Sequence, residues 1–427
     1  MLSRFNIRFL YNSIFVFFIF GCIFPTIRVL LIGNETSKTI LEYFVSSLLD
    51  IYILFLAIYS FYPVLKRGKL PVLNFFDWIV IIFAISNIVL GIILAHNIKL
   101  SIYAIRMSYV PLIFYFLIKF HKNNLIEVKV LVDKIFKIFF FVALAGFILY
   151  FGFYETMINM INRAGGVVNE YFVIRMTSFF WSPVIFGTFM AISFLYFFYK
   201  ETQKHSFYNY IFISAIWICL LLSVSRGPLV ISVIGILFLT FLLKKWKSLF
   251  ITICLTILCF FIISYYINSP SEFIRWTMHS SVGTVSLEKN NTRADLWKKS
   301  FEDFRYNPFG HGLGKAGHVA ARFSNKNYKE FSASSTDGWF LKLANETGVW
   351  GLISYLFLAL TFSIQSVKYI YQKNNKLFIF IFVIFIIINI QNIVSNVLDF
   401  YLLAHLFWLL IGISQIIKTE SSINEKS

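Results

Sequence analysis

The sequence predicts an all-α integral membrane protein with about twelve membrane-spanning helices and one large external loop that contains short helices. Hydrophobic residues make up 59% of the 427 positions and charged residues only 14%, whereas roughly a quarter of a soluble domain is charged. Apolar runs of about 20 residues, the length that crosses a bilayer, recur along the chain. The basic residues gather in short connections between these runs, as the positive-inside rule requires.

Twelve apolar runs are candidate spans, and their boundaries are approximate. They lie at roughly 9–31, 41–64, 72–95, 100–119, 131–153, 177–199, 207–224, 228–243, 248–267, 348–370, 377–398 and 402–417. The first run lacks a small-residue cleavage site and is followed by further spans. We therefore expect it to stay in the protein as a helix and not to be removed as a signal peptide.

The orientation follows from the connections that fall on the side of the N-terminus. Each of them is basic: Lys66-Arg67-Gly68-Lys69, His121-Lys122 with Lys129, Lys200 and Lys204, Lys244-Lys245-Trp246-Lys247, Lys373 with Lys376, and the tail from Lys418. Both termini are therefore predicted to be cytoplasmic. The same distribution explains the net charge of +18 without a nucleic-acid partner, and the expected surroundings are a lipid bilayer.

The long outward connection divides the chain into residues 1–267 with nine spans, the loop 268–347, and residues 348–427 with three spans and the cytoplasmic tail. Within the loop, Asn291-Thr292 predicts a helix start. An apolar stripe at Trp297, Phe301 and Phe304 then predicts a short amphipathic helix, which Asn307-Pro308 ends. The loop is therefore expected to fold.

Arginines at the outer interface are the first candidates for chemistry. Arg226 joins two spans with no polar spacer, and a guanidinium at this depth suits a lipid diphosphate better than a simple anchoring role. For Arg175, diphosphate binding and an anchoring role are equally compatible with the sequence. Arg163, in the same outward connection, is more typical of a structural residue. Arg293 falls at a predicted helix N-terminus, where the peptide N–H groups favour an anion. Arg106, inside the fourth span, requires a partner or a cavity.

The polar loop offers further candidates. The alternating Gly310, Gly312 and Gly314 predict a backbone turn that another chain segment or a ligand approaches closely, but the flanking residues of a P-loop are absent from this sequence. Asp337 could cap the following helix or act as a general base. The loop histidines match no zinc-ligand spacing, so no metal site is predicted; they are His279, His311 and His318. Asp399 and His405 are expected to make packed polar contacts with Gln391 or Asn392.

The order of these motifs resembles the bacterial O-antigen ligase/polymerase membrane family. The resemblance covers about residues 163 to 400 and rests on four elements, which are Ser225-Arg226-Gly227, Arg293 to Trp297, Pro308 to Gly314, and Glu346-Thr347-Gly348-Val349-Trp350-Gly351. Ligases of the family usually carry His-Asn where this chain has Asp337-Gly338. This departure favours a polymerase of O-antigen repeat units and leaves the identity of the base open, because carboxylate replaces imidazole imperfectly near neutral pH.

The resemblance implies a GT-C-like fold in the bacterial inner membrane and an inverting glycosyltransferase without metal or cofactor. Its substrate would be an undecaprenyl-diphosphate-linked oligosaccharide, and a chain-length regulator remains open as a partner. The implied catalytic residues are Asp337, Arg226 and Arg293. The implied diphosphate- and glycan-binding residues are Arg226, Arg293, Arg175, Arg163, His311, Gly310, Gly312 and Gly314. The alternatives are ligation of glycan to lipid A core and a polysaccharide flippase, although no inverted repeat typical of transporters is evident.

Overall fold

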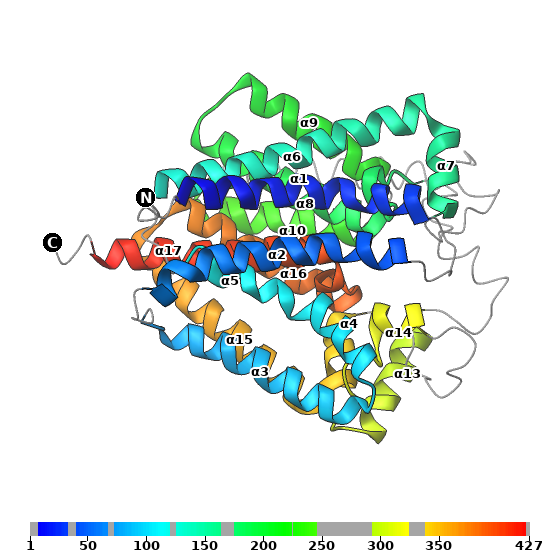
Figure 1. The fold of residues 1–427 in the computed structure, drawn as a ribbon. Helices are drawn as coiled ribbons and strands as arrows, with labels where there is room; N and C mark the ends of the chain where they lie inside the picture. The colour runs from blue at the N-terminus through cyan, green and yellow to red at the C-terminus, as the bar shows by residue number, and fades with distance from the viewer. Residues whose placement is uncertain are drawn as a thin grey trace. The chain divides into compact units, whose positions relative to one another are not determined.

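The computed structural model describes residues 7–32, 40–66, 72–119, 125–163, 175–223, 225–245, 293–323 and 338–423. These residues form helices and turns and include no strand, which confirms the all-α class (Figure 1). Contacts between Cα atoms divide the chain into two compact units. Unit 1 comprises Met1–Gly68 and Phe120–Gly283, and unit 2 comprises Lys69–Lys119 and Thr284–Ser427.

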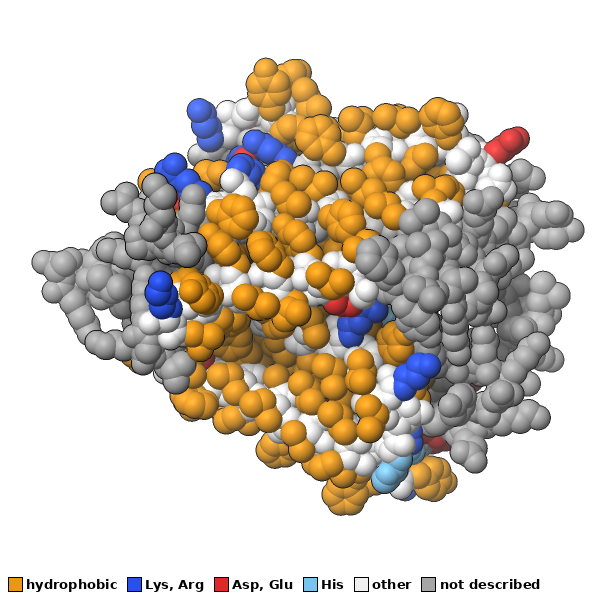
Figure 2. Space-filling view, in the orientation of Figure 1, with side chains coloured by type: hydrophobic (Ala, Val, Ile, Leu, Met, Phe, Trp, Pro, Cys, Tyr) orange, Lys and Arg blue, Asp and Glu red, His pale blue; other side chains and the backbone are white. Residues whose placement is uncertain are grey.

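Nine helical segments in the described part of the chain are long and apolar enough to cross a membrane, and two shorter apolar helices accompany them. These eleven segments coincide with eleven of the predicted spans; the remaining prediction, 248–267, lies outside the described residues. Hydrophobic side chains cover much of the face shown in Figure 2. Leu54, Ile58 and Ile82 are among the exposed apolar residues of the membrane-spanning helices. Such a surface is stable in contact with lipid, so the chain is a multi-pass membrane protein.

Unit 1 is a helical bundle in which α8 is the most enclosed span. Its elements are α1 (Ile7–Ile32), α2 (Ile40–Lys66), α6 (Leu125–Gly152), α7 (Tyr154–Arg163), η2 (Ser178–Phe180), α8 (Pro183–Gln203), α9 (Phe207–Leu222) and α10 (Arg226–Leu242). Helix α8 packs against α6, α9 and α10, and α1 packs against α2 and α6. Aromatic rings fill these contacts; the Phe136 and Tyr196 rings stack with centroids 4.2 Å apart. The short helix α7 occupies the start of a connection for which no helix was predicted.

Unit 2 combines the remaining spans with part of the predicted external loop. Its elements are α3 (Phe75–Ala95), α4 (Ile98–Ser108), η1 (Val110–Leu112), α5 (Ile113–Leu117), α13 (Arg293–Tyr306), α14 (Gly317–Phe323), α15 (Trp339–Lys373), α16 (Lys376–Val394), η3 (Val397–Asp399) and α17 (Tyr401–Ile423). The loop helix predicted from the apolar stripe is α13, and it ends at the residue before Asn307, as expected. The fourth predicted span is instead broken into α4, η1 and α5 at Pro111, which has no N–H to continue the helical ladder.

Helix α15 has a sharp break at Gly348, where the tenth span was expected to begin. Gly348 has φ 70° and ψ −158°, and helix continues on its N-terminal side to Trp339. In an unbroken helix the Val349 N–H would donate to the Asn345 carbonyl. Here Val349 donates to the Pro308 carbonyl (2.8 Å), and Asn345 accepts from the His311 N–H (2.7 Å). The segment Pro308–Gly314, called the glycine turn below, therefore completes the hydrogen bonding of the broken helix.

The glycine turn fits against α15 and the α3–α4 junction because it lacks side chains at its closest contacts. A Cβ on Gly310 would lie 2.6 Å from the Gly348 nitrogen, and one on Gly312 would lie 2.2 Å from the Ala95 Cα. Both glycines also have positive φ, 90° and 98°, which side chains disfavour. The close backbone approach predicted from the alternating glycines is thus made by the protein's own chain.

Replacing Gly312 by Ala should destabilise unit 2. The new Cβ would overlap the Ala95 backbone, and the alanine would have to keep the positive φ of Gly312. Together these two effects should lower the free energy of unfolding by about 2 kcal/mol or more. Thermal unfolding of detergent-purified protein would show a lower Tm for G312A. The matched control is G152A at the end of α6, where a Cβ meets nothing within 4 Å and the Tm should be unchanged or slightly higher. Equal Tm values for the two variants would contradict the interlocked packing.

Candidate functional site

Arg226 is the first residue of α10, in unit 1, and its side chain is exposed. Helix α9 ends at Leu222, so the two spans are joined without a long polar spacer, as predicted. The N-cap residue Ser225 makes no capping hydrogen bond, because its hydroxyl donates to the Ser223 carbonyl (3.3 Å). The Ser225 side chain therefore does not cap the first-turn N–H groups of α10. A guanidinium and a helix N-terminus coincide at this point, and both favour an anion.

Arg175 is held at the same end of unit 1. The N–H of Met176, its neighbour, donates to the Leu222 carbonyl at the end of α9 (3.0 Å), and the Arg175 side chain is half-buried. Arg163 is the last residue of α7, and its side chain lies outside the described part of the chain. The structure thus brings Arg175 close in the fold to the α9–α10 connection that carries Arg226.

His311 is the side chain of the glycine turn best placed to bind or relay a proton. Its Nδ1 lies 3.3 Å from the Asn307 amide nitrogen, and its buried Nε2 has no hydrogen-bond partner among the described residues. Burial lowers the pKa of His311 below the ordinary 6.5; the Asp303 carboxylate opposes this shift and the Lys315 ammonium adds to it. His311 is therefore predominantly neutral at pH 7.

Two residues of unit 2 that were predicted for the site, Arg293 and Asp337, have side chains outside the described part of the structure. Arg293 begins α13, as expected for a residue at a helix N-terminus, but only its backbone is described. Asp337 lies outside the described residues, two positions before the start of α15. Arg226 and Arg175 belong to unit 1, whereas Arg293 and the glycine turn belong to unit 2, and each unit is described by itself. The roles of these residues stay predictions.

A buried charged cluster that the sequence analysis missed lies beside the glycine turn. The Lys342 ammonium contacts the Asp399 carboxylate (2.5 Å), the Ser108 hydroxyl (2.8 Å) and the Glu346 carboxylate (3.8 Å). Lys342, Glu346 and Asp399 are each 1% exposed. Glu346 also accepts the Gly314 N–H (2.9 Å), so the cluster reaches the turn itself. The sequence signal was the i, i+4 pair of Lys342 and Glu346 just before a span.

The expected partners of two polar residues near the last span were wrong. Asp399 pairs with Lys342 and not with Gln391 or Asn392, because η3 turns its carboxylate toward the first turns of α15. The side-chain amide oxygen Oδ1 of Asn392 accepts the Leu398 N–H (3.3 Å). His405 bonds through Nδ1 to the Tyr401 carbonyl, and its ring meets the Phe114 ring edge-on. The Arg106 guanidinium, expected to need a partner, lies over the Tyr401 ring at 5.8 Å.

A second buried Lys–Asp pair is located at the opposite end of unit 2. Asp77, in the first turn of α3, accepts hydrogen bonds from the Tyr115 hydroxyl (2.5 Å) and pairs with Lys119. Asp77 also forms a capping box with Asn74. This pair therefore has an evident structural function at a helix start.

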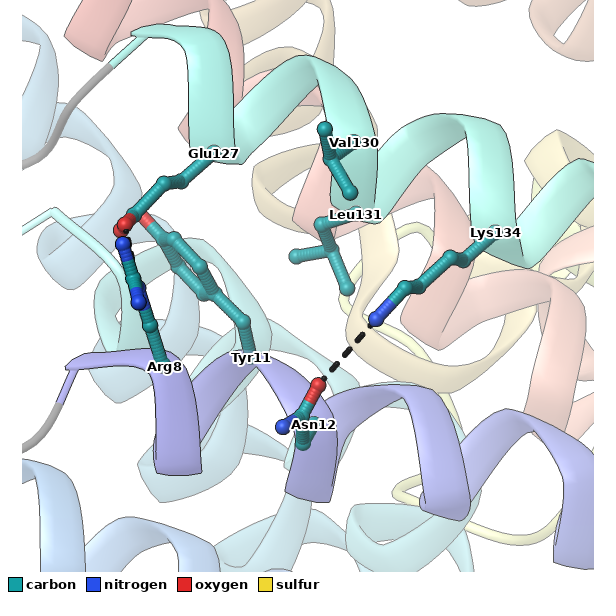
Figure 3. Close-up of a pocket in the computed structure, with 7 residues that line it drawn as sticks. All are labelled: Arg8, Tyr11, Asn12, Glu127, Val130, Leu131 and Lys134. Atoms are coloured by element: carbon teal, nitrogen blue, oxygen red, sulfur yellow. Dashed lines mark hydrogen bonds and ion pairs between the residues drawn. The ribbon is translucent and has the colours of Figure 1, made fainter.

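A pocket of unit 1 lies between α1 and α6 (Figure 3). It is separate from the end of the unit that carries Arg175 and Arg226, called the arginine end below. It encloses about 250 Å³ and is lined by Arg8, Tyr11, Asn12, Glu127, Val130, Leu131 and Lys134. Arg8 pairs with Glu127 (2.9 Å), and Lys134 bonds to Asn12 (3.3 Å). The α6 residues of the pocket lie in the first half of that helix, whereas Cys219, near the end of α9, donates to the Ala143 carbonyl in its second half. Arg226 and the pocket therefore occupy opposite ends of unit 1.

These observations define a multi-pass all-α membrane protein with arginines at a helix end and an interlocked glycine turn beside a buried charged cluster. Residues 210–356, about a third of the chain, match a family described as O-antigen ligase. The matched segment contains Arg226, α13, the glycine turn and Glu346. The match supports the O-antigen ligase/polymerase family, whose members transfer glycans, and does not separate polymerase from ligase. No curated protein matches the chain.

Acidification should weaken the fold through His311. Its folded-state pKa is below the ordinary 6.5, so the unfolded chain binds a proton more readily and stability falls as the pH drops below about 6.5. His311→Gln removes this titration. We expect the Tm difference, wild type minus H311Q, to be larger at pH 7.5 than at pH 5.0 in thermal unfolding scans. A difference that is the same at both pH values would show that His311 is not held neutral by the fold.

Proposed function

We propose that the protein is a polysaccharide polymerase that joins undecaprenyl-diphosphate-linked repeat units at the outer face of the bacterial inner membrane. The family match over residues 210–356 is the observation that carries the glycan-transfer part of this proposal, because the matched segment contains Arg226, α13, the glycine turn and Glu346. The exposed Arg226 at the uncapped start of α10 supports it, since that position suits a diphosphate. A flippase function receives no support from the match.

In the proposed reaction, a hydroxyl of the acceptor sugar attacks the anomeric carbon of the donor glycan with inversion. The bond from the anomeric carbon to the diphosphate oxygen breaks, and a bond to the acceptor oxygen forms. The proton of the hydroxyl passes to a base, for which Asp337 is the candidate. The lipid diphosphate leaves with its negative charge stabilised by Arg226 and Arg293, with Arg175 in support. In this scheme the guanidinium groups stabilise the negative charge of the leaving diphosphate, and no divalent metal is required.

The glycine turn is proposed to face the glycan near the leaving diphosphate. His311 would offer a neutral imidazole there, able to donate or accept a hydrogen bond. Gly310, Gly312 and Gly314 would act mainly by keeping the turn in place, because their closest neighbours belong to the chain itself. Arg163 is retained as a candidate glycan contact at the arginine end of unit 1.

Ligation of glycan to lipid A core is the second candidate function. The matched family carries the ligase description, so this function fits the match at least as well. Polymerisation is favoured only by Asp337-Gly338, which stands where ligases of the resembling family usually carry His-Asn. The two functions share the donor and the leaving group and differ in the acceptor.

Removing the charge at Arg226 should strongly slow transfer. Arg226→Ala is expected to lower the turnover of a purified lipid-linked repeat unit by about a hundredfold or more, because the leaving diphosphate loses a fixed cation. Arg226→Lys should restore part of the rate, since lysine keeps the charge but not the bidentate geometry. The control is Arg8→Ala at the opposite end of unit 1, which should transfer at the wild-type rate. A normal rate in R226A would remove the arginine from the mechanism.

The acceptor decides between the two functions. Wild-type protein is incubated with the lipid-linked repeat unit alone and, separately, with lipid A core added, and the products are separated by size. Longer lipid-linked glycans in the first mixture indicate a polymerase. Glycan on lipid A core, with no elongation in the first mixture, indicates a ligase. If neither product forms, the proposed function is wrong.

A further inference from the structure

We infer that Lys342 is a positioning residue for glycan transfer: its buried ammonium fixes the N-terminal arm of α15, Trp339–Thr347, which in turn holds the glycine turn and His311. This inference rests on the proposed function, in which the turn faces the glycan. Lys342 is 1% exposed and its ammonium is engaged by the Asp399, Ser108 and Glu346 side chains, so it acts through other residues.

The ammonium joins three separate elements at one point. Lys342 lies in the first turns of α15, Asp399 in η3 between α16 and α17, and Ser108 at the end of α4. Two of the three contacts are at hydrogen-bonding distance, 2.5 Å and 2.8 Å. The Lys342 backbone N–H also donates to the Gly338 carbonyl (3.0 Å), at the start of the helix. The arm is thereby tied to the spans on two sides.

The arm then determines where the glycine turn lies. The Asn345 and Glu346 carbonyls accept the N–H groups of His311 (2.7 Å) and Gly312 (2.9 Å). The Glu346 side chain accepts the N–H of Gly314 (2.9 Å). Every one of these acceptors lies within four residues of Lys342, about one helical turn. A shift of the arm therefore shifts the His311 backbone with it.

Stability alone does not account for a charge at this position. Two buried opposite charges lose much hydration, and uncharged residues of similar volume often give equal or greater stability. The packing around the pair is also close: a Cβ on Gly317 would lie 2.9 Å from the Lys342 Cδ and 3.2 Å from the Asp399 Oδ2. That Oδ2 has no hydrogen-bond partner among the described residues. These facts fit a Lys342–Asp399 contact that fixes the orientation of the N-terminal arm of α15 better than a contact that only stabilises the fold.

The test compares two neutralised clusters of the full-length protein in detergent. Lys342→Met, Glu346→Gln and Asp399→Asn are combined in one variant, which preserves volume and leaves no buried charge unpaired. Lys119→Met with Asp77→Asn does the same at the opposite end of unit 2, away from the glycine turn. Tm, kcat and the KM for the lipid-linked repeat unit are measured for wild type and both variants.

We expect the Lys342 cluster variant to keep a Tm near that of wild type, to lose kcat by about tenfold or more, and to change KM by less than about threefold. The Lys119 variant should keep the wild-type kcat. Wild-type kcat in the Lys342 cluster variant would overturn the inference, as would an equal loss in both variants. An inactive wild type would instead overturn the proposed function, so the two failures are distinguishable.

A milder variant keeps the inference testable if the neutralised protein does not fold. Ser108→Ala removes one hydrogen bond to the ammonium and leaves every buried charge in place. Because Ser108 is only half-buried, the fold should tolerate the change. We expect kcat to fall by roughly threefold at an unchanged Tm. An unchanged kcat in S108A would count against positioning by Lys342.

Discussion

The structure of unit 2 depends on the backbone hydrogen bonds that the glycine turn exchanges with the broken helix α15. Peptide groups inside a membrane bundle have no water to bond to and must pair within the protein. Each peptide group that stays unpaired in an apolar environment destabilises the fold by several kcal/mol. The break at Gly348 is therefore tolerable only with a second segment that supplies both a donor and an acceptor. His311 and Pro308 provide these groups, and the absence of side chains at Gly310 and Gly348 allows the two backbones to meet.

The sequence predicted the features that depend on local pattern. Hydropathy identified the eleven described spans, the stripe through Trp297 and Phe301 identified α13, and the alternating glycines indicated a close backbone approach. It could not show that the approaching segment is α15, because this contact joins residues distant in sequence. It also treated 348–370 as a span that begins at Gly348, since an apolar window cannot distinguish a helix start from a break inside a longer helix.

The candidate site was predicted less completely for a physical reason. Isolated arginines at helix ends stand out in an apolar sequence, so Arg226 and Arg175 could be named as candidates, and their roles stay predictions. Lys342 and Asp399 are 57 residues apart, and each has an ordinary local explanation. Their pairing becomes visible only when η3 brings the carboxylate against the first turns of α15. Charged groups that interact through tertiary structure leave little trace in spacing, even when they are fully buried.

The interlocked turn also restricts which changes of length the chain can accept. His311, Gly312 and Gly314 each donate a backbone N–H to an acceptor on α15. Inserting or deleting one residue between Pro308 and Gly314 would move these donors out of register and place a Cβ at a contact that has room only for hydrogen. The spacing of this segment is consequently as constrained as its composition, and related chains should vary in length elsewhere before they vary here.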